Sequence, residues 1–131
     1  MARVIGLGGV FFKAADPEAL GQWYATWLGV PVQPPYGASF LPGAMPPGGF
    51  SVWAPFAART KYFSPSRRAF MINLVVDDLD GALAQVREGG ARVIDGPEES
   101  EYGRFGWFMD PDGNKVELWQ PPAALPGALG G

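Results

Sequence analysis

The sequence predicts a mixed α+β domain with internal pseudo-symmetry. One pattern occurs twice, over residues 10–32 and again over residues 71–93: an apolar strand, an acidic residue, an amphipathic helix, a glycine and a further strand. The chain has 131 residues, the length of one domain, and half of it alone would bury only about 60% of its unfolded surface and be marginally stable. We therefore expect the two copies to share a sheet, with a binding site in the groove between them.

Composition argues against several classes of function. The formal net charge is −3, from 10 basic and 13 acidic residues, whereas nucleic-acid binders present a strongly basic face. No apolar run approaches the roughly 18 residues that cross a bilayer. The first residues enter a strand-like segment without the apolar region of a secretory signal. These features predict a cytoplasmic protein that binds neither nucleic acid nor a membrane.

The chain contains no cysteine and no histidine. The first absence excludes disulfides, thiolate catalysis and zinc-thiolate sites. The second excludes any catalytic triad with a histidine base and any metal site with a histidine ligand. Carboxylates, lysine, arginine, tyrosine and serine remain as candidate chemical groups.

The first copy opens with a predicted strand over residues 9–14, whose alternation places Phe11 and Lys13 on one face. A helix should follow, because Asp16 suits the N-cap and Pro17 the first helical turn. Its apolar stripe, spaced as on one helical face, ends at Gly29 and consists of Leu20, Trp23, Tyr24, Trp27 and Leu28.

A proline- and glycine-rich excursion over residues 33–49 follows, with a short predicted strand at residues 39–41. Such a loop can be a lid over a site or plain disorder, and the sequence leaves both open. Residues 50–53 are predicted to close the first copy as a strand, and residues 57–68 to form a linker.

The second copy begins with a strand over residues 71–76, on which Met71 and Asn73 face away from the following helix. That helix should begin at residues 77–80 and stop at Gly89. Strands over residues 103–109 and 115–120 flank a turn at residues 110–114. The tail from residue 122 to 131 is poor in large apolar groups, so we expect it to fray.

Three motifs in this order resemble one superfamily. They are Asp16-Pro17-Glu18-Ala19 leading to Trp23-Tyr24 and Leu28-Gly29, then Val76-Asp77-Asp78-Leu79-Asp80, then Asp110-Pro111-Asp112-Gly113-Asn114-Lys115-Val116-Glu117-Leu118. The chain resembles the vicinal oxygen chelate superfamily of glyoxalases, bleomycin and fosfomycin resistance proteins and extradiol dioxygenases. The resemblance implies two βαβββ modules, at about 5–56 and 69–121, that form an incomplete eight-stranded barrel in a single glyoxalase-like domain, and it implies a homodimer.

Active members of this superfamily usually hold one divalent metal through four positions. The resemblance places these positions at Gly9, Trp53, Met71 and Glu117, and only Glu117 can bind a cation. One carboxylate, even with the Asn73 amide oxygen, falls well short of the set of about six ligands that such metals prefer. We therefore expect no metal and no other cofactor.

The alternation also predicts which side chains face the barrel. They form aromatic walls with a few polar groups, a composition typical of small-molecule pockets. The predicted binding residues are Phe11, Lys13, Trp53, Met71, Asn73, Phe105, Trp107, Glu117 and Trp119, and Ser51 and Lys115 face the same way. These residues predict a protein that binds a small, largely apolar or planar molecule, unless the aromatics merely fill the barrel.

Glu117 admits two interpretations. Desolvation among the indoles would suit it to act as a general base, with Lys13 stabilising an oxyanion, in a metal-free lyase or isomerase. An ion pair with Lys13 or Lys115 would instead fix the strand register and exclude the strong base. Arg104 should point away from the cavity, and Tyr62 is a candidate for the pocket rim or a dimer contact, although a plain surface position fits the sequence equally well. A metal-dependent lyase or dioxygenase is less favoured.

Overall fold

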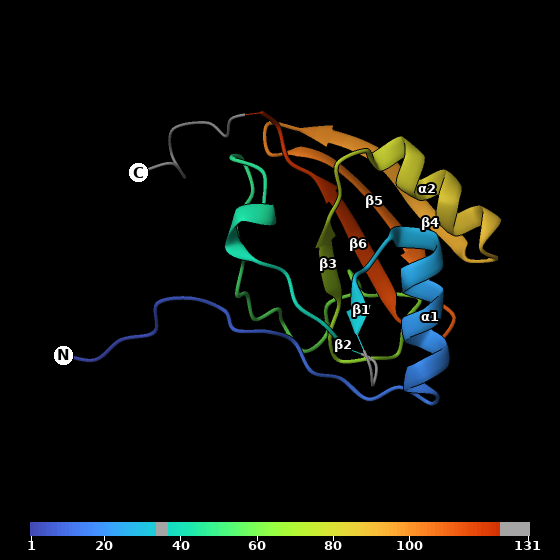
Figure 1. Ribbon diagram of the computed structural model, residues 1–131, viewed down its shortest axis with the longest axis horizontal. Coiled ribbons are helices and arrows are strands. Elements are labelled where there is room, and N and C mark those ends of the chain that lie inside the picture. The colour runs from blue at the N-terminus through green and yellow to red at the C-terminus, as the bar shows by residue number, and fades with distance from the viewer. Residues whose placement is uncertain (34–36, 124–131) are drawn as a thin grey trace.

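The computed structural model describes residues 1–33 and 37–123, and these form an open, mixed α+β structure (Figure 1). Its four-stranded sheet has the order β3-β6-β5-β4. The strands are β3 (Ile72–Val75), β4 (Arg92–Ser100), β5 (Gly103–Met109) and β6 (Lys115–Gln120). β3 runs parallel to β6, and the other neighbours are antiparallel. The predicted α+β class is confirmed, and the sheet does not close into a barrel.

Helix α1 (Pro17–Leu28) begins and ends where the sequence predicts. The Asp16 carboxylate accepts a hydrogen bond from the Ala19 backbone N–H at 3.1 Å, and Pro17 occupies the first turn, where no backbone donor is needed. Gly29 ends the helix with a φ of +63°, in the left-handed region that favours glycine.

Helix α2 (Leu79–Glu88) uses the same device, because the Asp78 carboxylate accepts from the Gly81 N–H at 3.1 Å. Together β3, α2, β4, β5 and β6 form one complete βαβββ unit, as predicted for the second copy. The buried stripe on α2 consists of the four predicted residues, Leu79, Ala82, Leu83 and Val86.

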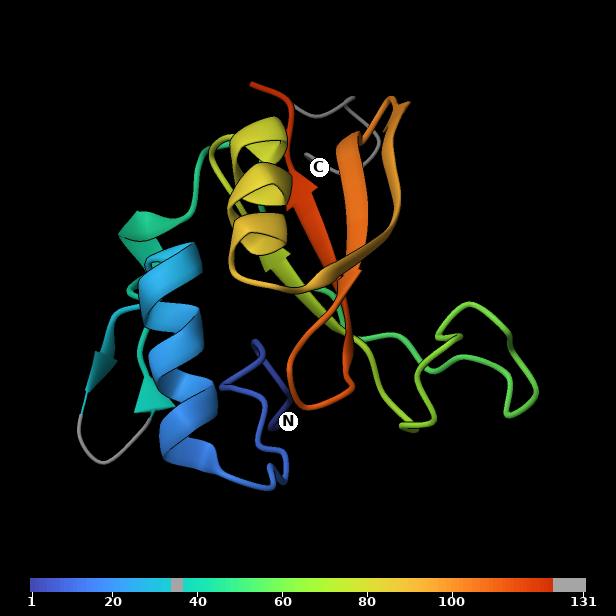
Figure 2. The same ribbon diagram turned by 90° about the vertical axis from the view of Figure 1, so that its right-hand side faces the viewer.

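Both helices cover one side of the sheet, and the linker of residues 57–68 projects on the other side (Figure 2). The core lies under the helices, where α2 packs on Phe108, Val116 and Leu118. Helix α1 also packs on this unit: the Trp23 ring lies 5.9 Å from that of Phe108, and its Nε1 donates to the Gly89 carbonyl at 2.9 Å. The alternate residues of β5 and β6 therefore face away from both helices.

The first copy differs from its prediction. Residues 9–14 and 50–53 are not strands, and among the described residues this half contributes, besides α1, only β1 (Val32–Gln33), β2 (Gly37–Ala38) and a short 3-10 turn (Pro42–Ala44). The Phe11 and Trp53 side chains are 97% and 81% exposed. Alternation shows that a segment suits a half-buried sheet, but a strand also needs a neighbour to pair with. In the described chain β3 pairs only with β6, so these segments have no strand beside them.

The predicted strand at residues 39–41 is also displaced, because β2 lies at Gly37–Ala38. Residues 34–36 of the predicted 33–49 excursion, and residues 124–131 of the predicted tail, lie outside the described residues.

Neither helix in the described ranges has the length and apolar character needed to cross a bilayer.

Candidate functional site

The Glu117 carboxylate is the centre of the candidate site. It lies on the sheet face away from the helices and is 9% exposed. Its Oε2 accepts hydrogen bonds from the Tyr62 hydroxyl at 2.5 Å and from Trp107 Nε1 at 2.8 Å. Its Oε1 accepts from the Asn73 side-chain amide at 2.6 Å. We call these four residues and Lys115 the Glu117 cluster.

The sheet register brings three members of the cluster together. In the parallel pair of β3 and β6, Asn73 lies opposite Glu117, and in the antiparallel pair of β5 and β6, Trp107 lies opposite Glu117. Side chains at directly opposed positions share a face and can touch. The prediction that Asn73, Trp107 and Glu117 share one face therefore matches the register.

An aromatic wall continues from the cluster along the same face. The Phe105 ring stacks on the rings of Trp107 and Trp119, with centroid distances of 6.4 and 6.1 Å and interplanar angles of 16° and 8°. Trp119 Nε1 donates to the Tyr102 carbonyl at 2.7 Å, which fixes that ring. Phe50 meets the Trp119 ring edge-on at 5.0 Å. These three nearly parallel rings form a flat apolar layer that ends at a carboxylate, in which Phe105 is half-buried and the two tryptophans are buried.

The predicted ion pair of Glu117 with Lys13 or Lys115 is wrong. Among the described residues, neither ammonium lies within salt-bridge distance of the Glu117 carboxylate. Lys115 is buried and donates from Nζ to the Tyr62 carbonyl at 2.6 Å, while its ammonium lies 5.2 Å from the Tyr62 ring centroid. The Lys115 ammonium thus donates to a backbone carbonyl of the linker. The two oxygens of Glu117 already accept hydrogen bonds from neutral donors.

Tyr62 joins the linker to the sheet, and sequence reasoning assigned it only to a rim or a dimer contact. Burial raises the pKa of the Tyr62 hydroxyl above its ordinary value. The hydrogen bond to Glu117 and the negative charge of Glu117 raise this pKa further. The phenol therefore remains a hydrogen-bond donor at neutral pH. The sequence offered one hint of the contact between Tyr62 and Glu117, which is a tyrosine within a charged linker. No periodic pattern relates Tyr62 to a residue 55 positions away.

Four predicted binding residues belong neither to the Glu117 cluster nor to the aromatic wall. Phe11 and Trp53 lie on exposed segments, and Lys13 is also exposed, with no hydrogen bond to Glu117. Met71 is half-buried just before β3. Asn73, Phe105, Trp107, Glu117 and Trp119 are brought together, so the second copy supplies the assembled part of the site.

The donor set does not fit a divalent metal. Glu117 offers the one carboxylate, and both of its oxygens already accept hydrogen bonds. The other implied ligand positions hold Gly9, Trp53 and Met71, which have no hard donor atom in their side chains. Within the described ranges, no group of three or more acidic, histidine or cysteine side chains is placed to hold a metal ion.

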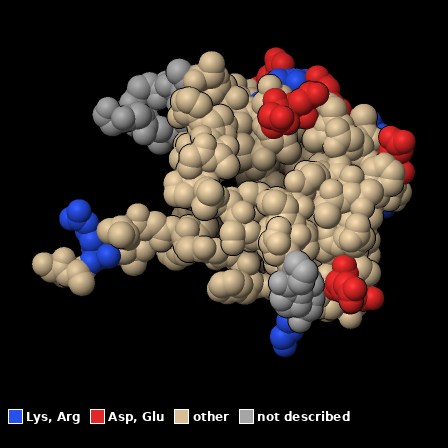
Figure 3. All heavy atoms as spheres, in the orientation of Figure 1, with Lys and Arg blue, Asp and Glu red and all other residues tan. Residues whose placement is uncertain are grey.

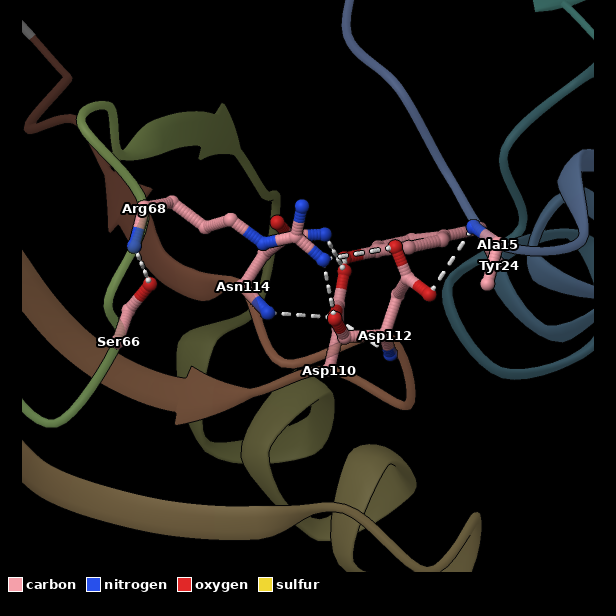
Figure 4. Close-up of polar contacts among 7 residues, drawn as sticks. All are labelled: Ala15, Tyr24, Ser66, Arg68, Asp110, Asp112 and Asn114. Carbon is pink, nitrogen blue, oxygen red and sulfur yellow. Dashed lines mark hydrogen bonds and ion pairs between the residues drawn. The ribbon is translucent and has the colours of Figure 1, made fainter.

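A second polar network surrounds the turn before β6 and has a structural character (Figure 4). The buried Asp110 carboxylate accepts from the Tyr24 hydroxyl and the Asn114 side-chain amide, both at 2.8 Å, and from the backbone N–H groups of Asp112 and Asn114 at 2.9 Å. Arg68 donates to the Asp112 carbonyl at 2.8 Å. The network thereby joins α1, the linker and the turn.

A hollow of about 620 Å³ beside this network includes Trp23, Arg92 and Asp110 in its lining but none of the Glu117 cluster. The buried carboxylate of Asp110 is already satisfied by four donors, so this carboxylate is not free to orient a ligand. The Glu117 cluster is therefore the stronger candidate for a binding site.

Charged side chains gather at the periphery of the view in Figure 3, and the acidic ones lie mainly toward α2 and the β4–β5 hairpin. Arg104 points to that side, with two hydrogen bonds of 3.0 Å to Asp80 and an ion pair with Glu99. The hydrogen bonds from Arg104 lower the pKa of Asp80. Arg104 therefore lies away from the Glu117 cluster, as predicted.

Replacing Tyr24 by phenylalanine should flatten the loss of stability at alkaline pH. Burial, followed by the charge of Asp110 and the hydrogen bond to it, raises the pKa of the Tyr24 hydroxyl above 10.0. The folded chain therefore keeps a proton that the unfolded chain loses, so this contribution is complete below about pH 10 and is lost as the pH rises further. Urea unfolding of Tyr24→Phe from about pH 8 to about pH 11 should give a shallower decline than the parent. Parallel curves would refute this assignment.

Comparisons with known proteins identify the family of the chain. The model of the family described as "Glyoxalase-like domain" matches residues 9–119. No curated protein matches the chain.

Solved structures give further similarities. VPC_CASS1, from the mobile metagenome of V. Pseudocholerae, shares the fold at 19% identity and a TM-score of 0.56, over 92% of this chain and 97% of that chain. TnmS3, an antibiotic binding protein from Streptomyces sp. CB03234, is 27% identical over 83% of this chain and 89% of that chain, with a TM-score of 0.48. A glyoxalase/bleomycin resistance protein from the same organism is 43% identical with a TM-score of 0.34, over 37% of this chain and 42% of that chain. The chain therefore matches less than half of that last protein.

Proposed function

Because the chain belongs to the glyoxalase-like domain family, within the vicinal oxygen chelate superfamily, we propose that it binds a small, planar or largely apolar organic molecule without a metal. The ligand lies on the aromatic wall of Phe105, Trp107 and Trp119, and Glu117 orients it. One observation carries the proposal: a buried carboxylate stands at the end of three nearly parallel rings. Apolar walls with a few fixed polar groups are the usual composition of a small-molecule site.

The access to this site supports the proposal. Asn73, which holds one oxygen of Glu117, lies on an exposed position of β3, and Phe105 is half-buried. The Tyr62 side chain, which holds the other oxygen, is 40% exposed. A ligand can therefore approach Glu117 across the β3 edge and the linker without opening the core beneath the helices.

The proposal includes a homodimer in the cytoplasm. Large apolar side chains are exposed along two stretches of the first half, and contiguous apolar surface of this kind usually marks an interface. A second copy of the chain would cover these stretches and could bring Phe11, Lys13 and Trp53 to the groove. The exposed apolar side chains are Val4, Ile5, Leu7, Val10, Phe11 and Phe12 in one stretch and Val52, Trp53 and Phe56 in the other.

No contact among the residues that the structure describes favours the alternative of a metal-free lyase or isomerase with Glu117 as its base. A general base must reach the proton that it removes, whereas both oxygens of Glu117 already accept hydrogen bonds. Lys13 is exposed and does not contact the carboxylate. Chemistry at Glu117 would show as turnover that chelators leave unchanged and that Glu117→Gln abolishes.

Phe105→Leu should weaken the binding of planar aromatic molecules about threefold to tenfold, because it removes the central ring of the wall. Native mass spectrometry of the protein as expressed would first reveal any retained ligand. A thermal-shift screen would then compare naphthalene, quinoline and acridine derivatives with their saturated analogues, since a bound ligand raises the melting temperature. Affinities follow by titration.

Phe40→Leu is the matched control, because Phe40 is 64% exposed and lies outside the wall. It should leave the affinities unchanged, and dialysis against EDTA should leave the thermal shifts of the parent protein unchanged. Equal thermal shifts for planar and saturated compounds, or an effect of Phe40→Leu as large as that of Phe105→Leu, would contradict the proposed site.

A further inference from the structure

Tyr62 occupies a place in the candidate site that a ligand could take. The other two donors to Glu117 belong to strands: Asn73 is fixed by the pairing of β3 with β6, and Trp107 by the pairing of β5 with β6. Tyr62 belongs to the linker, which lies outside the sheet and projects from it (Figure 2). It is therefore the one donor of the three that can leave without breaking the sheet.

The surroundings of the Tyr62 ring are those of a bound phenol. The ring meets Trp107 edge-on, with the centroids 6.2 Å apart and the planes at 86°. It stacks on Phe56 at 5.7 Å and 15°, and the Lys115 ammonium lies over it at 5.2 Å. These are favourable aromatic and cation–π geometries, and the hydroxyl completes the arrangement by donating to Glu117.

Removal of Tyr62 without a replacement would be unfavourable. Glu117 would lose a hydrogen bond to its charged group, and the buried Lys115 would lose the Tyr62 carbonyl. A ligand that takes this place must therefore offer a donor to Glu117. A hydroxyl group on a planar ring meets this requirement, whereas a methyl ether of the same shape does not.

We propose that the ligand of this site is a planar hydroxyarene, whose ring meets the Trp107 end of the aromatic wall in the place of the Tyr62 side chain and whose hydroxyl donates to Glu117. This inference rests on the proposed function and specifies the ligand class of that site. Without ligand, the phenol side chain of Tyr62 occupies this place, and the ligand must displace it. Only the side chain of Tyr62 moves aside when the ligand binds, so that Lys115 keeps its hydrogen bond to the Tyr62 carbonyl.

The test compares 2-naphthol with 2-methoxynaphthalene by equilibrium dialysis against the full chain. A site built to accept a hydrogen bond from a hydroxyl discriminates strongly against an analogue without that donor. The parent protein should bind 2-naphthol at least about tenfold more tightly than the ether, as expected for one hydrogen bond to a charged group. Tyr62→Phe should tighten the binding of 2-naphthol several-fold, because the competing hydroxyl is gone and the Glu117 oxygen is free.

Tyr102→Phe is the matched control, since it removes a tyrosine hydroxyl outside the cluster and keeps the backbone carbonyl that holds Trp119, and it should change neither affinity. Glu117→Gln should bring the two affinities close together, and circular dichroism would verify that this variant folds. If Glu117→Gln does not fold, the comparison of the parent protein with Tyr62→Phe still tests the inference.

Equal affinities for the two probes in the parent and in Tyr62→Phe would overturn the inference, but the proposed binding of planar molecules would stand. An unchanged or weakened affinity for 2-naphthol in Tyr62→Phe would overturn the displacement of Tyr62. No binding of either probe to any variant would overturn both the inference and the proposed function.

Discussion

Asp110→Ala is expected to lower the free energy of unfolding by about 3–5 kcal/mol, since it leaves several buried donors without an acceptor. The carboxylate is 6% exposed and accepts four hydrogen bonds from three residues. Two of the donors are the backbone N–H groups of Asp112 and Asn114 in the turn. Because Asn114 is buried, water cannot readily replace the lost acceptor there. The loss should include both the shape of the turn and the attachment of α1 through Tyr24. Urea unfolding at neutral pH measures it.

Asp112→Ala separates this effect from a general sensitivity of the turn. Asp112 also lies in the turn, but its carboxylate pairs at 3.2 Å with a partly exposed Arg68 and accepts one longer bond of 3.3 Å from Ala15. Such a pair is worth about 1 kcal/mol or less. Equal losses for Asp110→Ala and Asp112→Ala would show that the four-donor network does not stabilise the fold as described.

The sequence predicted the second copy well because local chemistry and long-range pairing agree there. Asp78 starts the helix, Gly89 follows its end, and the alternation of residues 115–119 separates Val116 and Leu118 in the core from Glu117 and Trp119 on the other face. The strand register then places Asn73 and Trp107 beside Glu117. Each step requires only neighbours within the same βαβββ unit.

The first copy shows what periodicity cannot predict. The α1 boundaries depend on Asp16, Pro17 and Gly29 and were predicted correctly, whereas the surface on which the helix packs depends on distant residues. Trp23 and Tyr24 contact the second unit, at Phe108 and Asp110, instead of a sheet of their own. The contact of Tyr62 with Glu117 is of the same kind, because a linker side chain has no register that would reveal its partner.

Phe108→Ala should lower the free energy of unfolding by about 3–5 kcal/mol, because it leaves a cavity where a large aromatic ring is fully buried. Phe108 joins the core under α2 to the Trp23 ring of α1, 5.9 Å away. If α1 packs on the second unit, the variant should also loosen α1. Hydrogen exchange of the α1 amides, measured beside urea unfolding, should therefore show reduced protection in the variant.

Phe11→Ala makes the same chemical change at a side chain that is 97% exposed, so in the monomer its effect should stay within about 0.5 kcal/mol. The two variants should also respond differently to protein concentration. The loss in Phe108→Ala is internal to one chain and should not depend on concentration. If a second copy covers the exposed apolar segment, Phe11→Ala should instead weaken association, and its effect on stability should grow as the concentration rises through the dimerisation range. A loss in dilute Phe11→Ala as large as that in Phe108→Ala would mean that residues 9–14 pack within their own chain, contrary to the exposed arrangement of the first copy.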